Sequence, residues 1–110
     1  TNPVNLLTDA VGLKIILQAN RPTESSIEVY YKTSLGSELL DNSPYIKAEL
    51  EGAIPADDDK TIFREYNYLV GGLHGGLDPF TSFVVKVVMT STNSSKVPTI
   101  KDLRAIALAV

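Results

Sequence analysis

His74 is the first residue to consider for catalysis, because it is the single histidine of this 110-residue chain. It lies between two glycine pairs in the stretch Gly71–Pro79. A catalytic triad needs a serine nucleophile and a metal site needs a second ligand, and we identify neither in the neighbouring sequence. The glycines do not form a phosphate-binding loop either, because Leu77-Asp-Pro79 follows them instead of a lysine and a serine or threonine. We therefore predict a loop histidine without a chemical role.

Three consecutive carboxylates, Asp57, Asp58 and Asp59, are the second candidate, for a calcium site. Calcium prefers several oxygen ligands. Consecutive side chains of an extended chain point in alternating directions, however, and the spacing of an EF-hand loop is absent. A solvated acidic turn is the favoured interpretation, with calcium binding in a sandwich loop as the alternative.

The tyrosines are candidates for a binding surface, and they are Tyr30, Tyr31, Tyr45, Tyr66 and Tyr68. On one hypothesis, Tyr30 and either Tyr66 or Tyr68 form an exposed aromatic platform for a sugar or a protein partner. On the competing interpretation, the tyrosines lie at the rim of the core with their hydroxyl groups in water.

Two polar motifs lie near the C-terminal end of the sequence. Asn93-Ser-Ser95 matches the glycosylation sequon, but its polar context before Val97-Pro98 favours the tip of a hairpin. Lys101, Asp102 and Arg104 interrupt the last apolar run. Asp102 and Arg104 can pair on one strand face or meet partners on a neighbouring strand. Such surface pairs stabilise little, and charges here also discourage incorrect pairing at a sheet edge.

No catalytic, cofactor-binding or metal-ligating residue is therefore predicted, and composition narrows the function classes further. The net charge is −3, and no basic stripe is present, which argues against nucleic acid as a partner. The absence of cysteine excludes disulfides, cysteine nucleophiles and thiolate metal sites. Every apolar run is far shorter than the ~20 residues of a membrane-spanning helix, so we expect no membrane insertion.

Alternating apolar residues predict most of the elements. Leu13–Asn20 and Ser26–Thr33 alternate as strands do, and the turn residues between them predict that the two pair as a hairpin. Thr61–Val70 is rich in aromatic and β-branched residues and is also predicted as a strand. Residues 1–12 are expected to be a poorly ordered lead-in to one domain at 13–110. Because the chain begins with threonine, we expect it to be a piece of a larger protein.

The last third of the chain is predicted to be the spine of the fold. Phe83–Met89 is a β-branched run of strand length, and Ile100–Leu108 follows after an exposed polar loop. The alanines of the second run also suit a helix, but Pro98 and the lack of a C-cap glycine favour a strand. Between the strands predicted at Ser26–Thr33 and Thr61–Val70, the segment Ser34–Lys60 is irregular. Within it, Tyr45–Leu50 fits either a short strand or a helical turn. Together these elements predict an all-β fold, an antiparallel β-sandwich or jelly roll with one long irregular loop.

One stretch carries a family resemblance: Phe83-Val-Val-Lys-Val-Val-Met-Thr-Ser-Thr-Asn-Ser-Ser-Lys-Val-Pro-Thr-Ile-Lys-Asp-Leu-Arg-Ala-Ile-Ala-Leu108. It resembles the end of structural proteins of tailed bacteriophages and is similar to segments of T4-type baseplate wedge and tail-fibre-associated proteins. Asn20-Arg-Pro22 followed by Ile27-Glu-Val-Tyr-Tyr-Lys32 fits the same resemblance. The resemblance implies a β-sandwich module of the virion that has no cofactor and no catalytic activity. Its partners would be other phage structural proteins or further copies of itself.

Three functions are thus distinguished. The first is a non-enzymatic structural module of a phage baseplate or tail that acts through protein–protein contacts. The alternative is a carbohydrate-binding or host-receptor-binding sandwich, which would use the loop at 34–59, through a glycan, calcium or receptor site, together with exposed tyrosines. An enzyme, most simply a hydrolase at the His74 loop, ranks below both.

Overall fold

The computed structural model describes residues 4–35, 44–71 and 79–108, and within them every regular element is a strand. The strands are β1 (Val4–Ala10), β2 (Gly12–Asn20), β3 (Ser25–Ser34), β4 (Ile46–Lys47), β5 (Arg64–Val70), β6 (Phe80–Ser91) and β7 (Thr99–Leu108). The prediction of strands at Leu13–Asn20, Ser26–Thr33, Phe83–Met89 and Ile100–Leu108 is confirmed. The strand predicted at Thr61–Val70 begins three residues later, at Arg64.

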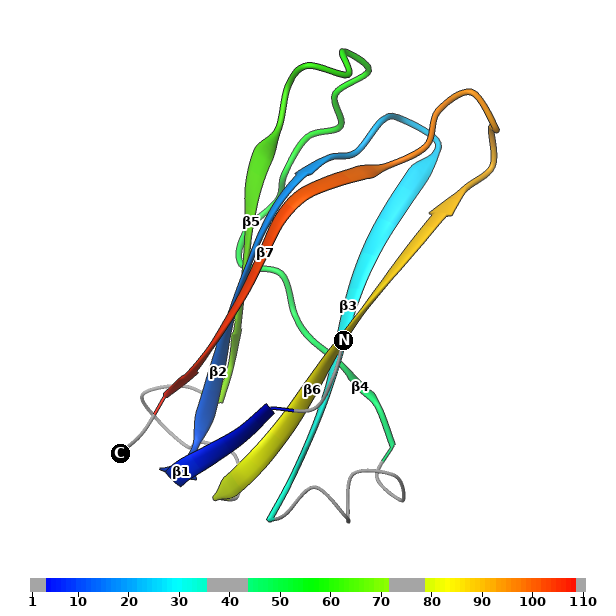
Figure 1. Ribbon diagram of the computed structural model, residues 1–110. Helices are drawn as coiled ribbons and strands as arrows, with labels where there is room; N and C mark the ends of the chain where they lie inside the picture. The colour runs from blue at the N-terminus through cyan, green and yellow to red at the C-terminus, as the bar shows by residue number, and fades with distance from the viewer. Residues whose placement is uncertain (1–3, 36–43, 72–78, 109–110) are drawn as a thin grey trace.

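The strands form two antiparallel sheets that pack face to face (Figure 1). One sheet has the order β1-β6-β3-β4 and the other has the order β5-β2-β7. Among these described strands, every connection except β3–β4 crosses from one sheet to the other. The predicted all-β sandwich is therefore confirmed.

Alternation along the strands builds the core between the sheets. Leu13, Ile15 and Leu17 of β2 have no exposed surface, and the residues between them are only partly buried. Val29 of β3 and Phe83 of β6 belong to the same apolar cluster, from the facing sheet. Each sheet thus contributes one apolar face, which is the arrangement that a period of two residues favours in a sandwich.

The predicted hairpin of the first two long strands is wrong. β2 pairs with β5 and β7, whereas β3 pairs with β6 and β4, so the turn after Asn20 carries the chain from one sheet to the other. Glu24 in this turn adopts a positive φ of 65°. Strand alternation is compatible with pairing edge to edge or with stacking face to face, and here burial of both apolar faces selects stacking.

The predicted lead-in at residues 1–12 is also wrong for Val4–Ala10, which forms β1 at the edge of the four-stranded sheet. Val4 lies opposite Phe83 and Asn5 opposite Ser82, and the Ser82 hydroxyl donates a 2.6 Å hydrogen bond to Asn5 Oδ1. The register shifts between Asn5 and Ala10. Polar residues and this irregularity hide the alternation that identifies a strand in the sequence.

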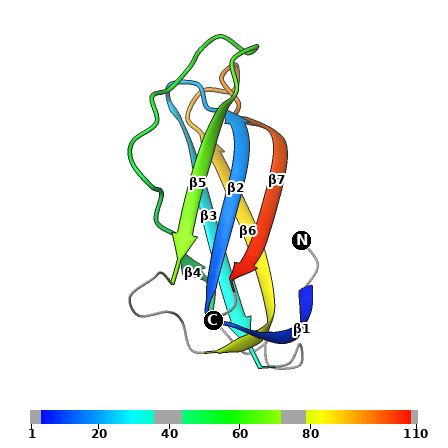
Figure 2. The ribbon, with the colours of Figure 1, turned by 90° about the vertical axis from the view of Figure 1, so that its left-hand side faces the viewer.

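The segment that follows β4 closes one side of the sandwich. Ala48 N donates to Val29 O in one sheet, and Glu51 N donates to Asn67 O in the other, both at 2.8 Å. Leu50 also forms an isolated bridge with Tyr68 of β5. Of the two interpretations of Tyr45–Leu50, the short strand is therefore the one observed. On the opposite side, Figure 2 shows β7 at the outer edge of its sheet.

Candidate functional site

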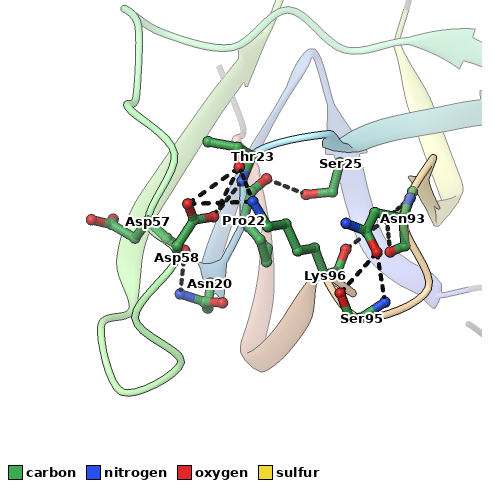
Figure 3. Close-up of polar contacts among 10 residues, drawn as sticks. Asn20, Pro22, Thr23, Ser25, Asp57, Asp58, Asn93, Ser95 and Lys96 are labelled. Atoms are coloured by element: carbon green, nitrogen blue, oxygen red, sulfur yellow. Dashed lines mark hydrogen bonds and ion pairs between the residues drawn. The ribbon is translucent and has the colours of Figure 1, made fainter.

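Polar side chains from three connections meet at one end of the sandwich (Figure 3). The Asp58 carboxylate accepts hydrogen bonds from Thr23 N at 2.9 Å and from Thr23 Oγ1 at 3.0 Å. Lys96 Nζ donates to Thr23 Oγ1 at 2.9 Å and lies 3.6 Å from Asp58 Oδ2. The hydrogen bonds from Thr23, its backbone first, lower the pKa of Asp58. The β2–β3 turn, the loop before β5 and the β6–β7 loop are thereby joined.

The neighbouring carboxylates have other partners. Asp57 forms an ion pair with Arg64, and Asp59 accepts hydrogen bonds from Thr61 N at 2.9 Å and from Thr61 Oγ1 at 2.7 Å. These bonds from Thr61, its hydroxyl first, lower the pKa of Asp59. The part of the chain that the structure describes contains no group of three or more His, Cys, Asp or Glu residues that could hold a metal ion. Of the three carboxylates, that of Asp58 joins loops and the other two bind nearby residues, so their geometry gives the calcium alternative no support.

Asn20 anchors the same loop from the end of β2. Its side chain is 1% exposed, and its amide nitrogen donates toward the carbonyl oxygens of Asp57 (3.2 Å), Asp59 (2.9 Å) and Ile62 (2.8 Å). Arg21 Nη2 adds a 3.0 Å hydrogen bond to Ile54 O. Analysis of the sequence missed this role of Asn20, although a polar residue at the end of a buried strand needs hydrogen-bond partners.

The sequon at Asn93 is part of the loop between β6 and β7. Asn93 Oδ1 accepts hydrogen bonds from Ser95 N at 3.0 Å and from Ser95 Oγ at 2.8 Å, which is an Asx turn. The interpretation as a polar turn is confirmed, but the loop is not a hairpin tip, because β6 and β7 lie in different sheets. His74 and its neighbours at 72–78 lie outside the described residues.

The predicted aromatic platform of Tyr30 with Tyr66 or Tyr68 is wrong. Tyr66 and Tyr68 lie opposite Leu17 and Ile15 in the paired strands and are 3% and 2% exposed, so both belong to the core. Burial raises the pKa of Tyr68 to about 12. Tyr30 instead faces outward on β3, where its hydroxyl donates to Glu28. This hydrogen bond is the main cause that raises the pKa of Tyr30.

A different tyrosine cluster covers the outer face of the four-stranded sheet. Lys32 Nζ and Lys86 Nζ each lie 4.6 Å from the ring centre of Tyr45, and Lys86 Nζ also lies 5.7 Å from the ring centre of Tyr30. We call these four residues the tyrosine–lysine cluster. Its two ammonium groups come from neighbouring strands, β3 and β6, and converge on one ring, which is a favourable cation–π geometry. Tyr45 is 38% exposed, so the cluster is accessible.

The charges of the last strand form an ion pair at a sheet edge. Arg104 Nε lies 3.1 Å from Asp102 Oδ2, so the predicted pairing on one strand face is observed. Lys101 Nζ lies 5.6 Å from the ring centre of Phe63. On one side β7 pairs with β2, and among the described strands none pairs with its other side. We call this outer backbone edge of Thr99–Leu108 the β7 edge.

Two exposed features, the β7 edge and the tyrosine–lysine cluster, are therefore the candidates for binding a partner. The described residues include no helix long and apolar enough to cross a membrane. Neither a protein-family model, nor a curated protein, nor a solved structure matches this chain.

Proposed function

We propose that this chain is a non-enzymatic structural module of a tailed-phage virion, located in the baseplate or tail and acting through contacts with other virion proteins. The observation that carries the proposal is the resemblance of Phe83–Leu108 to the ends of such proteins. In the fold this stretch contains most of β6, the crossing loop and all of β7, so it contributes one strand to each sheet. The resemblance therefore covers one of the connections that cross between the two sheets.

Two features of the surface support an assembly role. The β7 edge is a long strand edge, and such edges are surfaces on which another protein can add a strand. The polar side chains that converge at the loop end are paired with one another, as Asp58 is with Thr23 and Lys96. Groups held in this way rigidify a scaffold and are not poised to react with a substrate.

Mass spectrometry of purified phage particles tests the proposal. We expect peptides of this chain in density-gradient-purified particles of the phage that encodes it, in a constant ratio to known baseplate and tail proteins. A non-structural protein of the same phage serves as the control and should be lost on purification. Abundance of the chain in infected cells together with its absence from the particles would contradict the proposal.

The tyrosine–lysine cluster favours a second candidate function, the binding of an anionic saccharide on a host surface. Sugars stack on exposed aromatic rings, and ammonium groups attract carboxylate or phosphate substituents. Tyr45 is 38% exposed, and Lys32 and Lys86 place two positive charges over its ring. This candidate replaces the platform of Tyr30 with Tyr66 or Tyr68 as the aromatic surface of the chain.

A glycan array followed by Tyr45→Ala tests this second function. We expect binding to acidic oligosaccharides and weak or no binding to neutral ones, with a loss of at least about tenfold in Tyr45→Ala, since stacking and charge both act at this ring. Val97→Ala is the matched control, because Val97 is exposed but lies in the β6–β7 loop. Equal binding of neutral and acidic glycans, or an unchanged affinity of Tyr45→Ala, would reject the assignment.

A further inference from the structure

The β7 edge differs from the other sheet edges in the described part of the chain. β4 has two residues, β1 has an irregular register, and the edge of β5 is occupied in part by Leu50 and Glu51. β7 has ten residues, and from Asp102 to Leu108 it follows β2 without interruption. A long, regular edge presents unpaired backbone donors and acceptors to any strand that can approach it.

The charges on this edge are arranged so that a second copy of the same strand complements them. Asp102 and Arg104 lie opposite Gln18 and Ile16 of β2, so both point to the outer face of the sheet. In an antiparallel pair, residues on the same face lie opposite each other, and allowed registers differ by two residues. When Leu103 lies opposite Leu103 of a second copy, Asp102 of each chain meets Arg104 of the other. The two adjacent registers place Asp102 opposite Asp102, or Arg104 opposite Arg104.

We propose that β7 pairs antiparallel with β7 of a second copy of this chain, centred on Leu103, and joins two three-stranded sheets into one. This pairing identifies a second copy of the chain as the partner that binds the β7 edge. It rests on the proposed function, in which the β7 edge is a surface for assembly. Side-chain exposures of 42% for Asp102 and 70% for Arg104 leave both groups free to exchange their contact within the strand for contacts across the interface. The same charges that discourage incorrect edge pairing thus select one register.

The interface is small, so its expected behaviour is reversible and concentration-dependent. A single strand pair lies at the low end of protein interfaces, and its charge pairs remain exposed to salt. Regular pairing is limited to the residues around Leu103, because the register of β7 shifts between Asp102 and Ile100. Dimerisation is therefore expected to weaken when the salt concentration rises.

Sedimentation velocity over a concentration series tests the pairing with charge-reversal variants. Asp102→Arg and Arg104→Asp each place like charges at both crossing points, so each is expected to weaken self-association at least about tenfold. The double variant Asp102→Arg with Arg104→Asp restores opposite charges and should dimerise like the original chain. Lys14→Glu, on the outer face of β2, makes the same change of net charge as Arg104→Asp away from the edge and should have no effect.

Mixing the two single variants gives a stricter test. One chain then carries arginine at both positions and the other carries aspartate at both, so the mixture should form heterodimers although neither variant forms homodimers. Circular dichroism of each variant serves as the control that it is folded. A monomeric original chain at every concentration, or self-association that the single reversals do not change, would overturn the pairing.

The pairing and the proposed function fail in distinguishable ways. If the chain is found in phage particles but stays monomeric in solution, the β7 pairing is wrong and the structural role stands. If the charge-swap pattern is observed but the chain is absent from particles, the β7 pairing stands and the structural role in the virion is wrong.

Discussion

Leu17→Ala is expected to lower the free energy of unfolding by about 2–5 kcal/mol, the range for truncating a buried leucine. Leu17 has no exposed surface and lies on β2, the central strand of its sheet, between Tyr66 of β5 and Leu103 of β7. Its removal leaves a cavity that a strand paired on both sides cannot collapse to fill. A domain of this size has a stability of about 5–15 kcal/mol, so the change is a large fraction of the total.

Urea unfolding followed by circular dichroism measures this loss. We expect a lower midpoint with an unchanged slope, which indicates a change in stability and not in the unfolded state. Gln18→Ala is the matched control: it is the next residue of the same strand, it faces outward between Glu65 and Asp102, and its effect should stay within about 0.5 kcal/mol. Equal losses in the two variants would contradict the assignment of inner and outer faces on β2.

The existence of the long strands could be predicted from the sequence, because a period of two residues is a local property. Leu13, Ile15 and Leu17 alternate in the sequence, and the same residues have no exposed surface in the fold. The partner of each strand could not be predicted in this way. β2 and β3 have the same alternation whether they pair or stack, and only the complete set of strands shows that stacking buries both apolar faces.

The tyrosines of β5 carry a local signal for burial that the predicted aromatic platform overlooks. Tyr66, Tyr68 and Val70 alternate with Glu65, Asn67 and Leu69, so one face of this strand is apolar except for two hydroxyl groups. Leu69 on the outer face makes both faces look mixed. A count of alternate positions, however, is enough to place Tyr66 and Tyr68 in the core from the sequence alone.

The candidate surfaces depend on contacts between residues that are distant in the sequence. Tyr45 directly precedes β4, and it meets Lys86 only because β4 and β6 pair with opposite edges of β3, where Lys86 lies opposite Tyr30. The ion pair of Asp102 with Arg104 is local, and it was predicted as one of two possibilities. This ion pair lies at a sheet edge because of the order of the strands in the sheet. That order cannot be predicted from a local sequence pattern.

Asn20→Asp is expected to be among the most destabilising single changes in this chain, with a loss of at least about 3 kcal/mol at pH 7. The buried amide nitrogen of Asn20 lies within 3.2 Å of three backbone carbonyl oxygens. Aspartate has the same shape, but it places a carboxylate oxygen where a donor is needed. Acceptor then faces acceptor, and a charge is buried without a partner.

The loss of stability in Asn20→Asp should become smaller as the pH falls. A protonated carboxyl can donate one hydrogen bond to these carbonyls, so the folded state favours the protonated form and raises the pKa of the new aspartate above its unfolded value of about 3.9. Above the folded pKa the full loss is present. As the pH falls from the folded pKa toward the unfolded one, the stability of the variant approaches that of the original chain.

Asn20→Ala separates the missing donor from the added charge. It removes the hydrogen bonds without introducing a carboxylate, so its expected loss is about 1–3 kcal/mol and should not vary with pH relative to the original chain. Urea unfolding of both variants at several values between pH 4 and pH 8 makes the comparison. If Asn20→Ala loses no stability, the amide nitrogen is not what holds the loop; if the two losses are equal throughout, the carboxylate adds no penalty beyond the missing donor. If only the aspartate variant recovers in acid, the Asn20 amide anchors the 57–62 loop to the end of β2, in addition to the contacts that Asp58 makes with Thr23 and Lys96.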